Sequence, residues 1–367
     1  MPRFLTIFPV TENVHLIKDV GMLPFVLYNE FGYDSTIASY KNGEYPYLDT
    51  EVKGLKHVFI SNKFRNPIFD VLWFLFLNFR KYDIVQCYHF QRPSLWYLFF
   101  FKLLKKITFS KSFTFLKLDA TDDVKKLKLN AENKFLSKNV NLISVETKKL
   151  YNYLNEYNTL YRKVEYVPNG FIDKGLRNVI DFESKDNLMI TVGRIGIYEK
   201  NNEILLESFK EFALVNKEWK LEVIGPIEDS FEPYIKEYFD INPNLTDRVL
   251  FTGAITDRAL LEDKYNKAKI FVLTSINEGF PLVFLEAVKA GCTIISSAIS
   301  SAYDITDNEK YGALFTVGDS EALADELIKA ANNTDKLKND CDAIQQFAHT
   351  NYSWSKIGIR INELIRC

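Results

Sequence analysis

Cysteine is scarce in this chain of 367 residues, which has only four cysteines in all. Cys87, Cys292, Cys341 and Cys367 lie far apart and show no paired spacing. They predict neither a disulfide framework nor a cysteine-based metal site, and they fit a reducing cytoplasm.

Long apolar runs are missing as well. Residues 71–77 and 95–101 form apolar runs that end at Asn78 and Lys102, whereas a membrane-spanning helix needs roughly 20 such residues. Residues 1–7 lead directly into a strand-like pattern, so we expect no signal peptide. Together these absences predict a cytoplasmic protein without membrane spans.

Carboxylate pairs of the kind that hold a divalent cation are also rare. The only D-x-D string is Asp340-Cys341-Asp342, which lies in a polar region of helical character and is interpreted as a solvated surface. We therefore expect neither a bound metal ion nor a cofactor.

Length and charge both divide the chain in two. At 367 residues, with 47% apolar and 26% charged residues, it has the size and composition of a globular protein with two α/β domains. The net charge of −2 hides an asymmetry, because residues 1–170 hold 24 Lys+Arg against 16 Asp+Glu, and the remaining residues hold 22 against 32. A basic first half suggests contact with an acidic partner.

Short apolar strands alternate with amphipathic helices through the first half. The predicted strands are 4–8, 36–39, 57–60, 83–87, 113–118, 140–145 and 164–167. The predicted helices are 18–30, 67–80, 93–105, 122–136 and 147–157. This alternation indicates a parallel, doubly wound sheet.

A second alternating block follows the turn signal Pro168-Asn169-Gly170 and a polar stretch at 173–187, which is interpreted as a linker. Its predicted strands are 188–192, 220–224, 249–252, 270–273, 293–296 and 313–315. Its predicted helices are 202–215, 231–238, 257–266, 281–290 and 320–332. Two such blocks predict an α/β protein with two Rossmann-like domains.

The segment from residue 270 to residue 290 carries the strongest functional signal. It predicts a strand, a loop that contains Glu278 and Gly279, and a helix with Pro281 in its first turn. The first turn of a helix binds anions, and glycine lets a ligand approach the backbone. Glu278 and Glu286 would repel a phosphate, but carboxylates accept hydrogen bonds from sugar hydroxyls.

Glu278-Gly279-Phe280-Pro281, with Glu286 eight residues after the first glutamate, resembles the E-x7-E motif of retaining nucleotide-sugar glycosyltransferases of family 4. The alternative is a strand–helix junction with solvated glutamates, as in any α/β protein. Further segments resemble this family and occur in its order: 167–170 (V-P-N-G), 191–195 followed by Lys200, 223–226, 251–253 and 352–354.

The resemblance implies the GT-B fold, in which two Rossmann-like domains face each other and a C-terminal helix crosses back to the first. We expect an N-terminal acceptor domain at 1–172, a nucleotide-sugar domain at 187–350 and the crossover helix at 351–367.

Donor binding is expected mainly in the second half. Arg194 follows a predicted strand and offers a planar fork of donors, and Lys200 adds a compact positive charge. The resemblance implies that both hold the donor diphosphate, that Glu278 orients the sugar and that Glu286 holds the ribose. The other predicted donor contacts are Gly21, Gly193, Gly225, Gly253, Ala254, Gly279, Phe280 and Pro281. As single residues, such glycines are also common turn formers.

Acceptor contacts are expected in the first half. Residues 83–89 resemble the family's D-V-x-H-x-H strand end, whose last histidine reaches the reacting sugar. Counted without a gap, Tyr88 takes that place; with a shift of one residue, His89 does, and we favour His89 because imidazole both donates and accepts hydrogen bonds. Asp119 follows the fifth predicted strand and is either an acceptor contact or a helix cap.

These residues predict a retaining, metal-independent glycosyltransferase with Glu278, His89, Arg194 and Lys200 in its catalytic centre. We expect a nucleotide-diphosphate sugar as donor, with UDP favoured, and a glycan, lipid-linked or protein acceptor of bacterial surface-glycan assembly. No nucleic-acid partner is expected. The alternatives are a sugar-nucleotide epimerase with the same fold and a non-catalytic partner subunit that binds glycan. The sugar, the base, the acceptor and the oligomeric state remain open.

One stretch of the first half also suggests contact with anionic membrane. Residues 53–149 hold 19 Lys+Arg against 7 Asp+Glu, together with two aromatic runs near residues 69–79 and 96–101. Aromatic rings beside lysines are typical of interfacial helices, which would place the protein at the inner face of the membrane. The alternative is that both runs belong to core-facing helices of the first domain.

Overall fold

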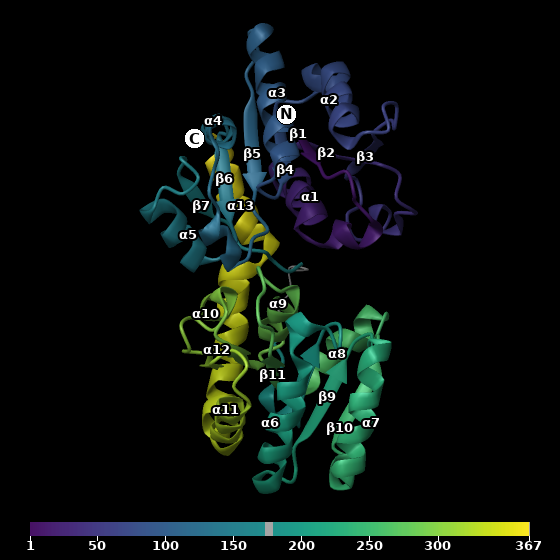
Figure 1. Cartoon of the computed structure of the whole chain (residues 1–367), viewed down its shortest axis with the longest axis vertical. Coiled ribbons are helices and arrows are strands. Elements are labelled where there is room, and N and C mark those ends of the chain that lie inside the picture. The colour runs from purple at the N-terminus through teal and green to yellow at the C-terminus, as the bar shows by residue number, and fades with distance from the viewer. Residues whose placement is uncertain (173–178, 367) are drawn as a thin grey trace. The chain divides into compact units, whose positions relative to one another are not determined.

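A computed structural model describes residues 1–172 and 179–366 and divides the chain into two compact units. The first unit comprises Met1–Ile172 together with the C-terminal residues from Tyr352, and the second comprises Asp173–Asn351. Each unit is built on one parallel sheet with alternating strands and helices (Figure 1). The two alternating blocks expected from the sequence are therefore confirmed.

The sheet of the first unit has seven parallel strands in the order β3-β2-β1-β4-β5-β6-β7. Their bounds are β1 Arg3–Ile7, β2 Asp34–Ser39, β3 Lys56–Phe59, β4 Ile84–Tyr88, β5 Phe113–Lys117, β6 Leu142–Val145 and β7 Val164–Tyr166. Successive residues such as Phe115 and Leu116 are both buried because helices cover both faces of the sheet. The strand order reverses between β1 and β4, which is where an open α/β sheet places a ligand crevice at its carboxyl edge.

Within its described residues, the first unit has six α-helices. They are α1 Asp19–Phe31, α2 Pro67–Asn78, α3 Arg92–Ile107, α4 Ala131–Lys138, α5 Lys148–Glu156 and α13 Trp354–Arg366. Asn66 caps α2 by accepting hydrogen bonds from the N–H groups of Ile68 and Phe69, and Pro67 follows in the first turn. The C-terminal helix α13 packs against α1, so the last residues of the chain complete the core of this unit.

The predicted helix at 122–136 is wrong. The structure has a short 3-10 helix at Asp122–Lys126 and then α4, which begins at Ala131. The Asn130 side chain accepts a hydrogen bond from the Asn133 N–H and so starts a new helix. The capping residue Asn130 thus divides the stretch that the sequence pattern presents as a single helix.

The sheet of the second unit has six parallel strands in the order β10-β9-β8-β11-β12-β13. Their bounds are β8 Asp186–Val192, β9 Lys220–Ile224, β10 Val249–Gly253, β11 Ala268–Leu273, β12 Thr293–Ser297 and β13 Gly312–Phe315. The α-helices are α6 Asn202–Val215, α7 Glu232–Ile241, α8 Arg258–Lys267, α9 Leu282–Lys289, α10 Ser300–Ile305, α11 Ser320–Asn332 and α12 Thr334–Tyr352, whose last residue belongs to the first unit. Here the strand order reverses between β8 and β11.

The predicted polar linker at 173–187 is only partly testable, because residues 173–178 lie outside the described part of the chain. Its remainder is wrong as a linker, since Phe182 and Lys185 are buried and β8 begins at Asp186. The Lys185 ammonium donates hydrogen bonds to the backbone carbonyls of Asn266 and Ala268 at 3.0 and 2.8 Å. A lysine in a polar stretch thus serves as a buried donor to the chain around β11.

Candidate functional site

A pocket in the second unit lies at the carboxyl ends of β8 and β11, where the strand order reverses. It is lined by residues 191–195, Lys200, Asn202 and 273–275. Open α/β sheets bind ligands at this position, because the loops after two neighbouring strands diverge there.

An ion pair joins the two loops beside this pocket. The Lys200 Nζ lies 2.5 Å from Oε1 of Glu278, and the Ser275 hydroxyl donates a hydrogen bond to the same oxygen at 2.9 Å. The Thr274 hydroxyl donates to the backbone carbonyl of Lys200 at 2.7 Å. The lysine and the glutamate predicted from separate motifs are therefore in direct contact, and both side chains stay about one-fifth exposed.

The segment from Gly193 to Asn202 is held in shape by contacts to its backbone. The Asn202 side chain accepts a hydrogen bond from the Gly196 N–H at 2.9 Å. A Cβ on Gly225 would lie 1.7 Å from the Gly193 carbonyl oxygen, so this glycine permits the ends of β8 and β9 to approach. Arg194 is exposed at this rim and forms no ion pair with the described residues.

The helix after Glu278 begins one residue later than predicted. Pro281 has extended backbone angles and forms the N-cap position, so α9 starts at Leu282 and not with the proline in its first turn. Phe280 is buried and anchors the loop, while Gly279 is partly exposed next to the helix start. The first turn of α9, which has free N–H groups, therefore begins shortly after Glu278 in the sequence.

Glu286 lies in the second turn of α9, apart from the residues that line the pocket. Burial raises the pKa of its carboxyl above the usual range, and the Tyr265 hydroxyl, Arg258 and Lys289 oppose that shift. Arg258 and Tyr265 belong to α8, so this carboxylate faces α8.

Gly253 and Ala254 lie at the carboxyl end of the outer strand β10. The Gly253 carbonyl accepts a hydrogen bond from the Gly225 N–H at 2.9 Å, and the space beside Gly253 is open. Both residues therefore lie on the same edge of the sheet as the pocket, two strands away from β8.

In the first unit, aromatic rings gather where β1 and β4 end. The Phe8 ring lies 5.3 Å from His15, 5.6 Å from Tyr88 and 6.0 Å from His89, centroid to centroid. His15 was not singled out in the sequence, because it lies in a short 3-10 helix before α1, Asn13–Ile17, and no motif marks it. Burial lowers the pKa of its imidazole, and the backbone N–H of Glu12 donates to its Nδ1 at 2.9 Å.

The structure distinguishes the two residues proposed for the strand end. Tyr88 is buried, and its hydroxyl accepts a hydrogen bond from the Gln86 amide at 3.1 Å. His89 is partly exposed and has a φ of +60°, which turns the chain away from the sheet. This geometry favours His89 as the ligand-facing side chain.

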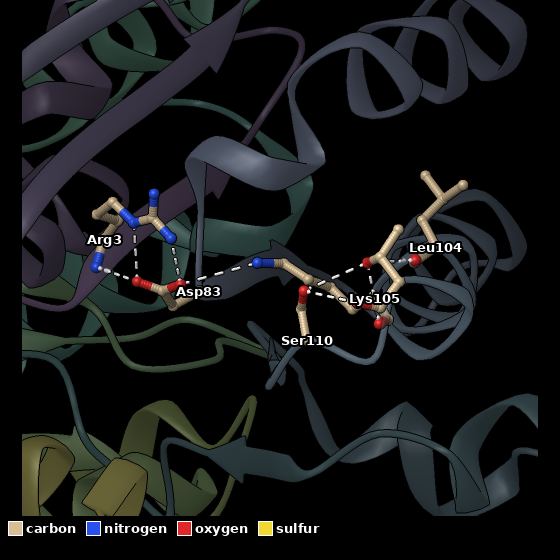
Figure 2. Close-up of polar contacts among 6 residues, drawn as sticks. Arg3, Asp83, Leu104, Lys105 and Ser110 are labelled. Carbon is tan, nitrogen blue, oxygen red and sulfur yellow. Dashed lines mark hydrogen bonds and ion pairs between the residues drawn. The ribbon is translucent and has the colours of Figure 1, made fainter.

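Asp83, the first residue of the same motif, lies at the opposite edge of the sheet. It accepts hydrogen bonds from Nε and a terminal guanidinium nitrogen of Arg3 at 2.9 and 2.6 Å, and Lys105 Nζ lies 3.7 Å away (Figure 2). The Arg3 hydrogen bond lowers the pKa of the Asp83 carboxyl. Five residues of β4 therefore separate a structural carboxylate from the candidate site.

The other two predicted site residues of the first unit, Gly21 and Asp119, differ in burial. Gly21 is buried in the first turn of α1, where a Cβ would lie 2.1 Å from the Leu16 carbonyl oxygen. The glycine therefore permits close packing against Leu16, and its contact with the donor stays a prediction. Asp119 is exposed just after β5.

Metal-ligating side chains do not gather in the part of the chain that the structure describes. Among residues 1–172 and 179–366, no group of three or more His, Cys, Asp or Glu side chains is placed to hold a metal ion. The Asp340-Cys341-Asp342 string lies on α12, where the buried Cys341 faces inward.

Comparisons with known proteins agree with this geometry. Residues 173–346 match the family model "Glycosyl transferases group 1". Among curated proteins, the chain is similar to the capsular polysaccharide biosynthesis glycosyltransferase CapM of Staphylococcus aureus, with 30% identity over 40% of this chain. It is also similar to the lipopolysaccharide core biosynthesis mannosyltransferase LpcC of Rhizobium leguminosarum bv. viciae, with 25% identity over 36% of this chain. The matched parts cover 38% and 37% of these two relatives.

Solved structures extend the likeness to the whole fold. HepE from Anabaena, in complex with UDP and glucose, covers the full chain with a TM-score of 0.73 and 14% identity, and all of HepE is covered. The lipopolysaccharide outer core galactosyltransferase WaaB covers 99% of this chain and of its own with a TM-score of 0.73 and 17% identity. The GT-B fold expected from the sequence is thereby confirmed. Residues 173–346 are thus similar to the group 1 glycosyl transferases, and the chain as a whole has the GT-B fold.

Proposed function

We propose that this protein is a retaining glycosyltransferase. It transfers a sugar from a nucleotide-diphosphate sugar, with UDP favoured, to a hydroxyl acceptor in bacterial polysaccharide, glycolipid or glycoprotein assembly. The observation that carries this proposal is the Lys200–Glu278 pair, which places a phosphate-binding cation and a sugar-binding carboxylate side by side at the β8/β11 pocket. The capsular polysaccharide relative and the UDP bound to HepE support the donor and pathway class.

The donor is held through charge and hydrogen bonding. Lys200, Arg194 and the first turn of α9 stabilise the diphosphate as negative charge develops on it. Among the described residues, both polar contacts of the Glu278 side chain are made by Oε1, so Oε2 is available to accept hydrogen bonds from sugar hydroxyls. Glu286 holds the ribose in this proposal.

The first unit supplies the acceptor side. His89 contacts the reacting sugar, and Asp119 contacts the acceptor from the end of β5. The acceptor oxygen attacks the anomeric carbon on the face from which the diphosphate leaves, so the configuration is retained. The positive side chains and the helix N-terminus stabilise the leaving group in place of a metal ion.

A screen of nucleotide sugars tests the function directly. Thermal-shift measurements identify the donor that stabilises the protein, because a ligand that binds only the folded state raises its stability. Product analysis with candidate acceptors then identifies the reaction and the anomeric configuration. Epimerisation without an acceptor would instead indicate a sugar-nucleotide epimerase, and the absence of nucleotide-sugar binding would indicate a non-catalytic partner subunit.

Removal of the proposed diphosphate contacts should slow transfer. Arg194→Ala and Lys200→Ala each remove a cation from the leaving group, and losing one such contact costs roughly 3 kcal/mol, or on the order of a hundredfold in kcat. Lys217→Ala removes an exposed lysine of the same unit and should leave the rate unchanged. A folded Arg194→Ala/Lys200→Ala double variant with near wild-type turnover contradicts the assignment.

Chelation should leave the activity intact. Since protein cations and the α9 N-terminus stabilise the diphosphate in this proposal, we expect equal initial rates in EDTA and in Mg²⁺. Rates are compared after dialysis against chelator. Loss of transfer in EDTA that Mg²⁺ or Mn²⁺ restores would show that the reaction depends on a metal ion.

Membrane docking is proposed for α2 and the residues before it, more narrowly than the sequence suggested. Tyr97 and Phe101 of α3 are buried, so the second aromatic run mostly serves the core. None of the described helices has the length and apolar character that crossing a membrane requires. The apolar side chains exposed on α2 and its lead-in are Phe64, Ile68, Phe69, Phe76 and Leu77, which we call the α2 face.

Charge complementarity supports anionic lipid as the proposed occupant of the α2 face. Lys63, Arg65, Arg80 and Lys81 are exposed around it, and the Lys63 ammonium lies 4.3 Å from the centroid of the Trp73 ring. Asp70, the single carboxylate of α2, is buried and accepts a hydrogen bond from the Phe64 N–H. The face therefore combines apolar rings with net positive charge, as interfacial helices do.

Vesicle co-sedimentation tests this docking. The protein should sediment with anionic vesicles, much less with neutral ones, and less as salt rises. Phe69→Ser/Leu77→Ser should reduce binding, whereas Leu214→Ser, which removes an exposed leucine from α6, should not. If the protein sediments with neither vesicle type at low salt, docking is contradicted and a soluble acceptor is favoured.

A further inference from the structure

A buried ion cluster lies at the carboxyl edge of the first unit's sheet. Lys117, the last residue of β5, is fully buried, and its ammonium lies 3.1 Å from Oδ2 of Asp19 and in contact with Oε1 of Glu146. It also donates a hydrogen bond to Oδ1 of Asn169 at 3.0 Å. One lysine thus ties together four segments: the first turn of α1, the end of β5, the residue after β6 and the turn after β7.

The cluster is costly to bury, and stability alone does not explain it. Buried ion pairs are often no more stable than apolar side chains of the same volume. Burial lowers the Lys117 pKa, but the carboxylates of Asp19 and Glu146 more than reverse this, so the pKa lies above its usual range and the side chain stays charged. Oε2 of Glu146 is buried and has no hydrogen-bond partner among the described residues.

The backbone of the same lysine holds His89. The carbonyl of Lys117 accepts a hydrogen bond from the His89 N–H at 3.0 Å, directly after the β4–β5 pairing of Tyr88 with Lys117. His89 has a φ of +60°, a left-handed conformation that is uncommon for a residue with a side chain. The backbone carbonyl of Lys117 therefore holds the turn at His89, and the ion cluster holds the side chain of Lys117.

We propose that Lys117 is a positioning residue for the acceptor side of the site. Its ion cluster fixes the carboxyl rim of the sheet and thereby holds the His89 imidazole in the orientation in which it contacts the reacting sugar. The kinetic consequence rests on the proposed glycosyltransferase function. The effect on His89 does not, because it is a property of the folded first unit.

Removing the charge of Lys117 alone tests stability more than positioning. Lys117→Met leaves the buried Glu146 and the partly buried Asp19 without their cation, so this variant is expected to melt at a lower temperature. The neutral triple variant Lys117→Met/Asp19→Asn/Glu146→Gln buries no unpaired charge, and we expect it to recover most of that loss. Lys105→Met is the matched control, since Lys105 is a buried lysine of the same unit that faces Asp83 at the opposite edge of the sheet (Figure 2).

Histidine ring NMR measures the positioning without reference to activity. The chain has four histidines, so ring resonances are few, and His89→Gln assigns the relevant one. In the folded triple variant, the His89 resonance should move or broaden, while that of His349 in the second unit should stay in place. With the donor and acceptor found by the screen, transfer should fall at least tenfold, with unchanged nucleotide-sugar binding.

Two results overturn the proposal. One is a folded triple variant whose His89 resonance matches wild type, and the other is an equal shift of that resonance in Lys105→Met, which would indicate general loosening. A wild-type protein that binds no nucleotide sugar contradicts the proposed function instead. The NMR comparison then still decides whether Lys117 positions His89.

Discussion

The contact between Lys200 and Glu278 is the interaction on which the proposed chemistry depends. It joins the segment after β8 to the loop after β11, and Ser275 adds a hydrogen bond to the same carboxylate oxygen. Without this pair, the cation proposed to bind phosphate and the carboxylate proposed to bind the sugar would lie on independent loops. With it, both groups have fixed positions before a donor arrives, which is the condition for stabilising charge without reorganisation.

In the first unit, too, the loops at the carboxyl edge of the sheet need fixed positions, and a buried ion cluster provides them. The carboxyl ends of parallel strands bring several loops to one edge, but the loops must still be fixed relative to one another. Lys117 does this with two carboxylates and an amide, and its carbonyl holds the left-handed turn at His89. In both units a lysine paired with carboxylates organises the edge where ligands are expected to bind.

The sequence predicts the alternation of strands and helices well, because strands buried on both faces leave continuous apolar runs. Prediction from the sequence pattern fails where capping or buried polar contacts override it. Asn130 starts α4 within a helical pattern, and Lys185 is a buried donor within a stretch that is polar in sequence. Motifs locate Lys200 and Glu278 but do not reveal their contact. No local motif marks Lys117 or Glu146. The two residues meet only because β5 and β6, which lie apart in the sequence, are neighbours in the sheet.

A crystal structure with a bound UDP-sugar tests the central claim most directly. We expect the diphosphate oxygens within hydrogen-bond distance of Lys200 and of the first-turn N–H groups of α9, and the sugar hydroxyls on Oε2 of Glu278. The Lys200–Glu278 pair should lengthen as the ammonium turns toward the phosphate. A nucleotide sugar bound away from the β8/β11 pocket, with this ion pair unchanged, would contradict the account.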